Sequence, residues 1–148
     1  MPRRVREASE SLLLDTHVWV WYIEAAGDRL SRTVLAQLRS HGQAGRLYVS
    51  PLSGWEVGML VVKRRLALSL DVRTWVTRAL EAPGVRAAEL TAHIALDAAL
   101  LDGAPPRDPA DRLLIATSRA LGAALVTQDA AILAYGRAGH LAVVDAGG

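Results

Sequence analysis

The chain of 148 residues contains no cysteine and no phenylalanine. The missing cysteine excludes a disulfide scaffold, a thiol nucleophile and a zinc site built on cysteines, and it is consistent with a reducing cytoplasm. Apolar side chains are not scarce, because 51% of the residues are hydrophobic and 22% are charged. This composition excludes an intrinsically disordered chain and favours one domain with a sizeable core.

A long uninterrupted hydrophobic run is also missing. The apolar stretch after the basic start is interrupted by Asp15 and His17, too early for a signal segment or a membrane span. We therefore expect a cytoplasmic protein with no membrane role.

Lysine is almost absent: of the 17 basic residues, Lys63 is the single lysine, and the 15 acidic residues leave a net charge of +2. The planar guanidinium of arginine binds phosphate through two parallel hydrogen bonds, which is compatible with a nucleic-acid partner. A bias toward arginine also follows from genomic base composition. The positions of the acidic residues are therefore more informative than the total charge.

Short apolar runs alternate with segments of helical periodicity along the chain, a pattern typical of βα units. It predicts an α/β fold with a central, mostly parallel sheet of four or five strands flanked by helices. We expect the domain to span 11–146, after a flexible arm at 1–10. The predicted strands are 11–15, 46–50, 85–90, 123–129 and 141–146, and the predicted helices are 18–25, 30–42 ending at Gly42, 51–65, 71–82, 91–103 ending at Gly103, 108–122 ending at Gly122, and 130–136.

Two predicted strands run directly into an acid, Asp15 after the first and Asp129 after the fourth. Glu56 and Asp111 lie in the first turns of helices that begin near the same edge of the sheet. Since ligands of open parallel sheets bind outside the carboxyl ends of the strands, we expect the four carboxylates to converge on one cleft. The alternative for Asp15 and Asp129 is a purely structural role, capping the helices that follow them.

The other two acids have structural alternatives as well. Ser53 and Glu56 have the spacing of a capping box, in which Glu56 reaches back to the Ser53 amide. In the segment DPADR, Asp108 is a natural helix cap with Pro109 at the first helical position. We therefore expect Asp108 to cap the helix and Asp111 to project into the cleft.

The structural alternatives weaken when the four acids are taken together. Unneutralised carboxylates within a few ångströms repel one another, so they need raised pKa values or a cation. Hard divalent cations take oxygen ligands, and Mg²⁺ uses one or two carboxylates together with waters and substrate phosphates. The pattern therefore indicates metal-assisted phosphoryl chemistry.

Four segments together resemble the PIN domain, and in particular the VapC-type toxin ribonucleases of bacterial toxin–antitoxin pairs. They are LLLDTHVWVW at 12–21, SPLSGWEVGMLVVKRRLAL at 50–68, RDPADRLLIATS at 107–118 and LVTQDAAI at 125–132. The resemblance implies a single three-layer domain and an endoribonuclease that hydrolyses RNA phosphodiester bonds with Mg²⁺ or Mn²⁺. Water would be the attacking group, so the products would carry 5′-phosphate and 3′-hydroxyl ends.

The resemblance also assigns roles to individual residues. Its catalytic and metal-binding acids would be Asp15, Glu56, Asp111 and Asp129, with Asp15 and Asp111 as direct ligands. Supporting roles would belong to Ser53 near Glu56 and to Thr127 through a hydrogen bond to a carboxylate or a metal-bound water. Arg112, beside Asp111, is expected either to bind a phosphate or to pair with an acid and support the geometry of the site. The residues expected to bind the RNA phosphates are Lys63, Arg64, Arg65 and Arg107, whose alternative role is that of a solvated helix end.

An antitoxin protein and a second copy of the chain are the partners that the resemblance implies. In such toxins the antitoxin lies along the apolar helices near 18–42 and 53–82, which here carry Trp19, Trp21 and Trp75. Core packing is the alternative for each tryptophan.

Three other functions remain open: a catalytically inactive PIN-like binding module, a nuclease acting on DNA, and a phosphatase-like α/β domain. The last is disfavoured, because the chain has no phosphate-binding glycine-rich loop and has DTH at Asp15 rather than a DxD nucleophile pattern.

Overall fold

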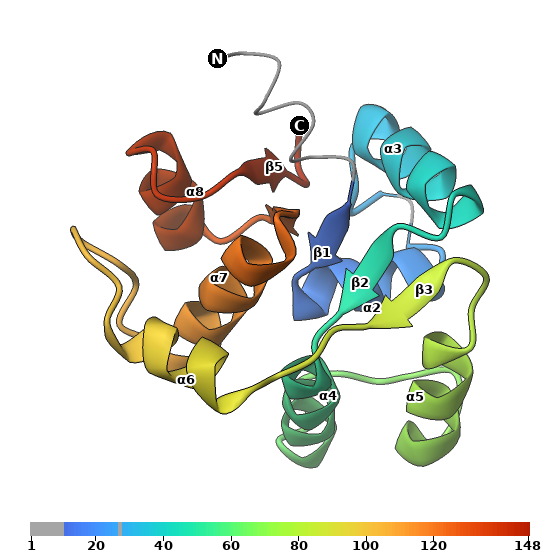
Figure 1. Ribbon diagram of the computed structural model, residues 1–148. Helices are drawn as coiled ribbons and strands as arrows, with labels where there is room; N and C mark the ends of the chain where they lie inside the picture. The colour runs from blue at the N-terminus through green and yellow to red at the C-terminus, as the bar shows by residue number, and fades with distance from the viewer. Residues whose placement is uncertain (1–10, 27) are drawn as a thin grey trace.

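Five parallel strands form the centre of the computed structural model, which describes residues 11–26 and 28–148. The expected arm at 1–10 lies outside this part of the chain. The strands lie in the order β3-β2-β1-β4-β5 (Figure 1), and the predicted α/β class is confirmed. Their bounds are β1 Leu12–Leu14, β2 Leu47–Val49, β3 Val85–Ala87, β4 Ala124–Thr127 and β5 Val143–Asp145.

The strand order reverses at β1. From β1 the chain moves to β2 on one side, and it later returns to β4 on the other side of β1. The carboxyl ends of β1 and β4 are therefore neighbours at the switch point, where an open parallel sheet offers its crevice. The register pairs Leu14 with Val126, so Asp15 and Thr127 follow at adjacent positions of this edge.

The helices cover both faces of the sheet. Leu12 and Leu14 pack into one core cluster together with residues of α2, α3 and α5, whereas Leu13 packs into a second cluster with α7 and α8. This alternation on β1 gives the three layers. The described helices are α2 Thr16–Ile23, α3 Arg32–Gln43, α4 Pro51–Val62, α5 Val72–Leu80, α6 Ala92–Ala99, α7 Pro109–Leu121 and α8 Ala130–Arg137.

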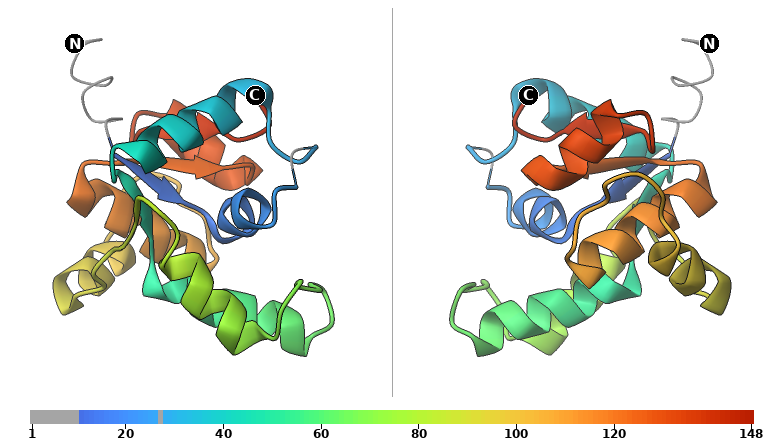
Figure 2. Two further views of the ribbon diagram at one scale, coloured as in Figure 1. Left: turned by 90° about the vertical axis from the view of Figure 1, so that its right-hand side faces the viewer. Right: turned by 90° about the vertical axis from the view of Figure 1, so that its left-hand side faces the viewer.

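Helices α4 and α5 lie side by side and extend beyond the sheet, as both views of Figure 2 show. The buried Trp75 of α5 packs edge-on against Trp19 of α2, with 5.0 Å between the ring centroids. Core packing therefore accounts for these two tryptophans. Across the described residues, the helices are too short or too polar to cross a bilayer.

The helix predicted over 51–65 ends at Val62, and two glycines predicted to end helices do not end them. The helix expected to stop at Gly42 continues to Gln43, with Gly42 buried inside it, and the left-handed residue that follows is Gly45. Gly42 lies in a tightly packed place instead, because a Cβ there would lie 3.2 Å from the Tyr22 hydroxyl oxygen. The helix expected to end at Gly103 ends at Ala99, and Gly103 lies in the loop beyond it.

Candidate functional site

A cleft of about 500 Å³ opens at the carboxyl ends of β1 and β4, at the switch point of the sheet. All four predicted acids line it, so the expected convergence is confirmed. Asp15 and Asp129 cap α2 and α8, and Asp111 lies in the first turn of α7. Glu56 is the sixth residue of α4, beyond the first turn in which the sequence predicted it. The lining residues are Asp15, His17, Val18, Trp21, Arg29, Glu56, Asp108, Asp111, Gln128 and Asp129.

Asp15 both caps α2 and lines the cleft. As the N-cap of α2, it accepts a hydrogen bond of 2.7 Å from the Thr16 amide through Oδ1. Its Oδ2 accepts a bond of 2.6 Å from the hydroxyl of Thr127, whose side chain is fully buried. The Thr127 hydroxyl in turn accepts a bond of 3.0 Å from the Asp129 amide. The predicted hydrogen bond from Thr127 to a carboxylate is therefore present, and it couples the ends of β1 and β4.

The predicted capping box at Ser53 and Glu56 is wrong. Helix α4 begins three residues earlier, with Ser50 as the N-cap and Pro51 in the first turn, where its fixed φ is preorganised for a helix. Glu56 instead accepts a hydrogen bond of 2.6 Å from the hydroxyl of Thr16. Ser53 is fully buried, and its Oγ shares a hydrogen bond of 2.9 Å with the same hydroxyl. Hydrogen bonds therefore link Ser53 to Glu56 through the Thr16 hydroxyl.

Asp108 and Asp111 occupy the first turn of α7 as the sequence predicts. Asp108 is the N-cap and accepts a hydrogen bond of 2.8 Å from the Ala110 amide, which leaves Asp111 to line the cleft. Asp108 lines the cleft too, as a fifth carboxylate that the prediction did not include. The spacing could have indicated it, because residues three apart lie on the same side of a helical turn.

The carboxylates of Asp15, Glu56 and Asp111 are partly buried and are repelled by neighbouring acids, and both effects raise their pKa values. Burial, followed by the charges of Asp129, Asp108, Asp15 and Glu56, raises the pKa of Asp111 to about 7. Burial also raises the pKa of Asp15, against the lowering effect of its hydrogen bonds from Thr127 and Thr16. For Glu56 burial again raises the pKa, and the hydrogen bond from Thr16 opposes it. A bound cation would relieve this repulsion.

The donors of the cleft fit a hard cation, although they are not arranged as a closed site. Over residues 11–26 and 28–148, no group of three or more Asp, Glu, His or Cys side chains is arranged so that it could coordinate one metal ion. Mg²⁺ does not require such a group, because it keeps several waters and binds through one or two carboxylates plus substrate phosphates. Asp15 and Asp111 can supply those carboxylate oxygens.

Arg112 does not pair with an acid, so that expectation is wrong. Its guanidinium donates to three backbone carbonyls, those of Ala98 at 2.9 Å, Ala99 at 3.1 Å and Pro106 at 3.3 Å. Ala98 and Ala99 are the last two residues of α6, whose carbonyls have no partner within the helix. Arg112 therefore joins the end of α6 to the loop that leads into α7.

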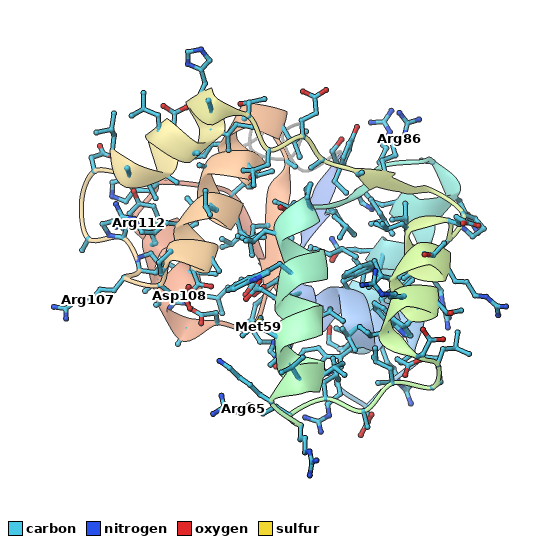
Figure 3. The ribbon with its side chains drawn as sticks, turned by 90° about the horizontal axis from the view of Figure 1, so that it is seen from below. Met59, Arg65, Arg86, Arg107, Asp108 and Arg112 are labelled. Atoms are coloured by element: carbon cyan, nitrogen blue, oxygen red, sulfur yellow. The ribbon has the colours of Figure 1, made fainter. Side chains whose placement is uncertain are left out.

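The basic residues expected to bind RNA do not line the acidic cleft. Lys63, Arg64 and Arg65 are exposed at and beyond the end of α4, and Arg107 is exposed before α7. Figure 3 shows Arg65 and Arg107 extending outward from the ribbon, and Asp108 lies near Arg107. In the described part of the chain, the one Lys or Arg that lines the cleft is Arg29, which no sequence motif marks.

Comparisons with known proteins agree with this geometry. The sequence model of the PIN domain family matches residues 12–138. The chain is 35% identical over 119 residues to Ribonuclease VapC22 from Mycobacterium tuberculosis, which covers 80% of this chain and 87% of that relative.

Two solved structures share the fold. The crystal structure of VapBC2 from Rickettsia felis, bound to a DNA fragment from their promoter, matches with a TM-score of 0.62 and 15% identity. The crystal structure of FitAcB from Neisseria gonorrhoeae matches with a TM-score of 0.55 and 20% identity. Each match covers 90% of this chain and 96% of the other.

Proposed function

The chain belongs to the PIN domain family, and from this membership we propose that it is a VapC-type endoribonuclease that hydrolyses RNA phosphodiester bonds with a divalent cation. The 35% identity to Ribonuclease VapC22 supports the choice of RNA as substrate. The observation that carries the proposal is the convergence of Asp15, Glu56, Asp111 and Asp129 on one cleft.

The hydroxyl groups near the cleft support attack by water rather than by a side chain. The Thr16 and Thr127 hydroxyls donate hydrogen bonds of 2.6 Å to Glu56 and Asp15, but both residues are buried, so neither hydroxyl is exposed to a substrate phosphate. Ser53 is fully buried behind Thr16. Because the chain also lacks cysteine, a water activated in the cleft is the nucleophile that this set of side chains suits best.

The four acids divide into two pairs in the proposal. Asp15 and Asp111 would hold Mg²⁺ or Mn²⁺ directly, and Glu56 and Asp129 would ligate the cation or orient waters. The chemistry that the cation supplies when bound is Lewis-acid stabilisation of the charge that develops on the phosphate. Thr127 fixes the orientation of Asp15, and Thr16 fixes that of Glu56. The expected products carry 5′-phosphate and 3′-hydroxyl ends, because no 2′-hydroxyl attack is involved.

An antitoxin is the proposed protein partner, with VapBC2 and FitAcB as the structural precedents. Helix α4 carries exposed apolar side chains, since Trp55 is 60% exposed and Val62 is 77% exposed. A groove between α4 and α5, with Gly54 and Gly58 in its lining, lies beside them. An apolar helix or strand of the antitoxin would fit this groove. We further propose that the chain forms a homodimer and acts in the cytoplasm as a toxin.

The test is cleavage of total RNA by the purified protein with Mg²⁺, followed by mapping of the product ends. We expect new 5′-phosphate ends with wild type and none with Asp15→Asn. The matched control is Asp71→Asn, a change at an exposed helix cap far from the cleft lining. Full activity of Asp15→Asn, or cleavage of DNA in preference to RNA, would contradict the proposal.

A further inference from the structure

Beyond the five acids, the cleft has a second part that the chemistry described above does not use. Its lining includes an imidazole, an indole and a guanidinium, those of His17, Trp21 and Arg29. Asp15 caps α2, so His17 is the second residue of that helix and Trp21 lies one turn further along. Residues four apart lie on the same side of a helix. An aromatic strip therefore leads away from the acids along α2.

The two rings are close to each other and accessible from the cleft. Their centroids are 5.8 Å apart with an interplanar angle of 44°. His17 is exposed and Trp21 is half-buried, in contrast to Trp19 of the same helix, which is fully buried. The imidazole lines the same cleft as the acids, and from this position its charge lowers the pKa of both Asp15 and Glu56. A group bound on these rings would therefore adjoin a phosphate held by the acids and their cation.

Arg29 belongs to the same strip. Its guanidinium carbon lies 6.0 Å from the centroid of the Trp21 ring, at the outer limit of a cation–π contact. The backbone of Arg29 is tied to the cleft, because the side-chain amide of Gln128 donates a hydrogen bond of 2.8 Å to the Arg29 carbonyl. Gln128 itself lies between Thr127 and Asp129 at the end of β4. The one Lys or Arg in the described cleft lining thus lies beside the Trp21 ring, with its backbone held by Gln128.

This combination suits an unpaired nucleotide. Proteins that bind single-stranded RNA stack its splayed bases on aromatic side chains and arginine planes, whereas a duplex hides the faces of its bases. A metal cage or a peptide groove would not need an exposed imidazole and indole next to a guanidinium. The inference rests on the proposed ribonuclease function and adds a substrate-positioning surface to it.

We propose that His17 and Trp21 form a stacking subsite for the base of a nucleotide next to the scissile phosphate, with Arg29 bound to a neighbouring phosphate. The substrate is therefore single-stranded at that position. The subsite selects for the presence of an unpaired base and positions the strand over the acids. It takes no part in bond breaking.

Binding measured without cleavage tests the subsite. The probes are two fluorescently labelled single strands in EDTA, an adenosine dodecaribonucleotide and an abasic dodecamer of 1-deoxyribose phosphates. Both carry the same phosphates and 2′-hydroxyls, so their affinity ratio reports on the bases alone. We expect wild type to bind the adenosine strand about tenfold more tightly, and Trp21→Leu and His17→Ala to lose most of this preference. Arg29→Ala should weaken the binding of both strands equally.

The matched control is Trp55→Ala, which removes an exposed indole outside the cleft lining and should keep the wild-type ratio. Since Trp21 also packs against the core, Trp21→Leu can lower the folded fraction. That effect cancels, because both affinities are measured on one preparation. A wild type without preference for the adenosine strand, or a Trp21→Leu variant that keeps the preference, would overturn the subsite.

Cleavage of RNA with Mg²⁺ is measured separately on the same proteins. A wild type that prefers the adenosine strand but cuts no RNA retains the stacking subsite and contradicts the proposed ribonuclease. A wild type that cuts RNA without any preference for bases retains the ribonuclease and contradicts the subsite.

Discussion

Thr127 donates its hydroxyl proton to Asp15 across 2.6 Å, although the two residues are 112 positions apart in the sequence. The pair joins the carboxyl ends of β4 and β1, which are neighbours because the strand order reverses there. The same hydroxyl accepts a bond from the Asp129 amide, so one buried side chain positions two acids. Disruption of this contact should therefore change both the stability and the chemistry of the cleft.

Thr127→Val keeps the size of the side chain and removes the hydroxyl. The Asp129 amide and one Asp15 oxygen lose a partner, which should lower the free energy of unfolding by about 1–3 kcal/mol. Residues that orient metal ligands typically contribute about 10–100-fold to metal affinity or activity. We expect a loss of that size in kcat and a higher Mg²⁺ concentration at half-maximal activity.

Thr127→Ser is the matched variant, because it retains the hydroxyl. It should recover most of the activity and the normal Mg²⁺ dependence. Equal losses in Thr127→Ser and Thr127→Val would show that the methyl group, rather than the hydrogen bond to Asp15, is what matters.

Asp111 makes the stability of the metal-free protein depend on pH. Its pKa is about 7 in the folded protein, against an ordinary value of 3.8. Between these values the folded state holds a proton that the unfolded state has released, so the free energy of unfolding decreases as pH rises. Burial and repulsion raise the pKa of Asp15 and Glu56 as well, which adds to the same slope.

Asp111→Asn should reduce this slope and stabilise the protein at pH 8 by about 1 kcal/mol, after allowance for solvent screening of a half-exposed group. Thermal unfolding in EDTA at pH 5 and pH 8 measures it. Asp71→Asn is the control, since the pKa of this exposed cap is lowered from 3.8 and the residue stays ionised over that range. A wild type that becomes more stable from pH 5 to pH 8 would contradict the prediction.

Gly58 provides a test of the proposed antitoxin groove. A Cβ at this position meets no atom within 4 Å, so Gly58→Leu directs an apolar side chain into the groove between α4 and α5. The change also favours the helical state. We expect unchanged RNA cleavage and at least tenfold weaker binding of the antitoxin, measured by calorimetry. Ala134→Leu on the exposed side of α8 is the control, and tight antitoxin binding by Gly58→Leu would rule out this groove.

Gly84 is expected to be essential for the fold. It has a φ of +79°, and a Cβ there would lie 1.6 Å from the carbonyl oxygen of Gly42. Gly84→Ala should lower the free energy of unfolding by about 3 kcal/mol or more, since strain and a backbone clash add. The contrasting variant Gly54→Ala lies in open space within α4 and should be neutral or slightly stabilising. Chemical denaturation measures both, and equal stability of the two variants would refute this explanation.

The strands and the acids could be predicted from the sequence because local patterns determine them. Apolar runs that end in Asp15 and Asp129 define both the strands and their edge of the sheet. The ends of the helices were harder to predict from the sequence. Gly42 has the features of a stop signal, yet it lies inside the helix, where a Cβ would lie close to Tyr22 of a distant segment. Ser53 matched a capping box, but Ser50 and the following proline start the helix earlier.

The remaining parts of the cleft depend on tertiary structure. Arg112 adjoins Asp111 in sequence, yet its guanidinium turns to the carbonyls of α6, which no local pattern indicates. Arg29 reaches the cleft because Gln128 holds its backbone, a bond between residues 99 positions apart. His17 and Trp21 follow the Asp15 motif, but only the fold shows that their side of α2 lines the cleft.

The central claim is that the carboxylates of the cleft hold the cation with which the chain cuts RNA. The most direct measurement is cleavage of RNA by wild type treated with EDTA and then titrated with Mg²⁺ or Mn²⁺, beside Asp15→Asn and Asp71→Asn. We predict that EDTA abolishes cleavage, that either cation restores it for wild type and Asp71→Asn, and that Asp15→Asn stays inactive throughout. Full cleavage of RNA in excess EDTA, or by Asp15→Asn, would contradict the claim.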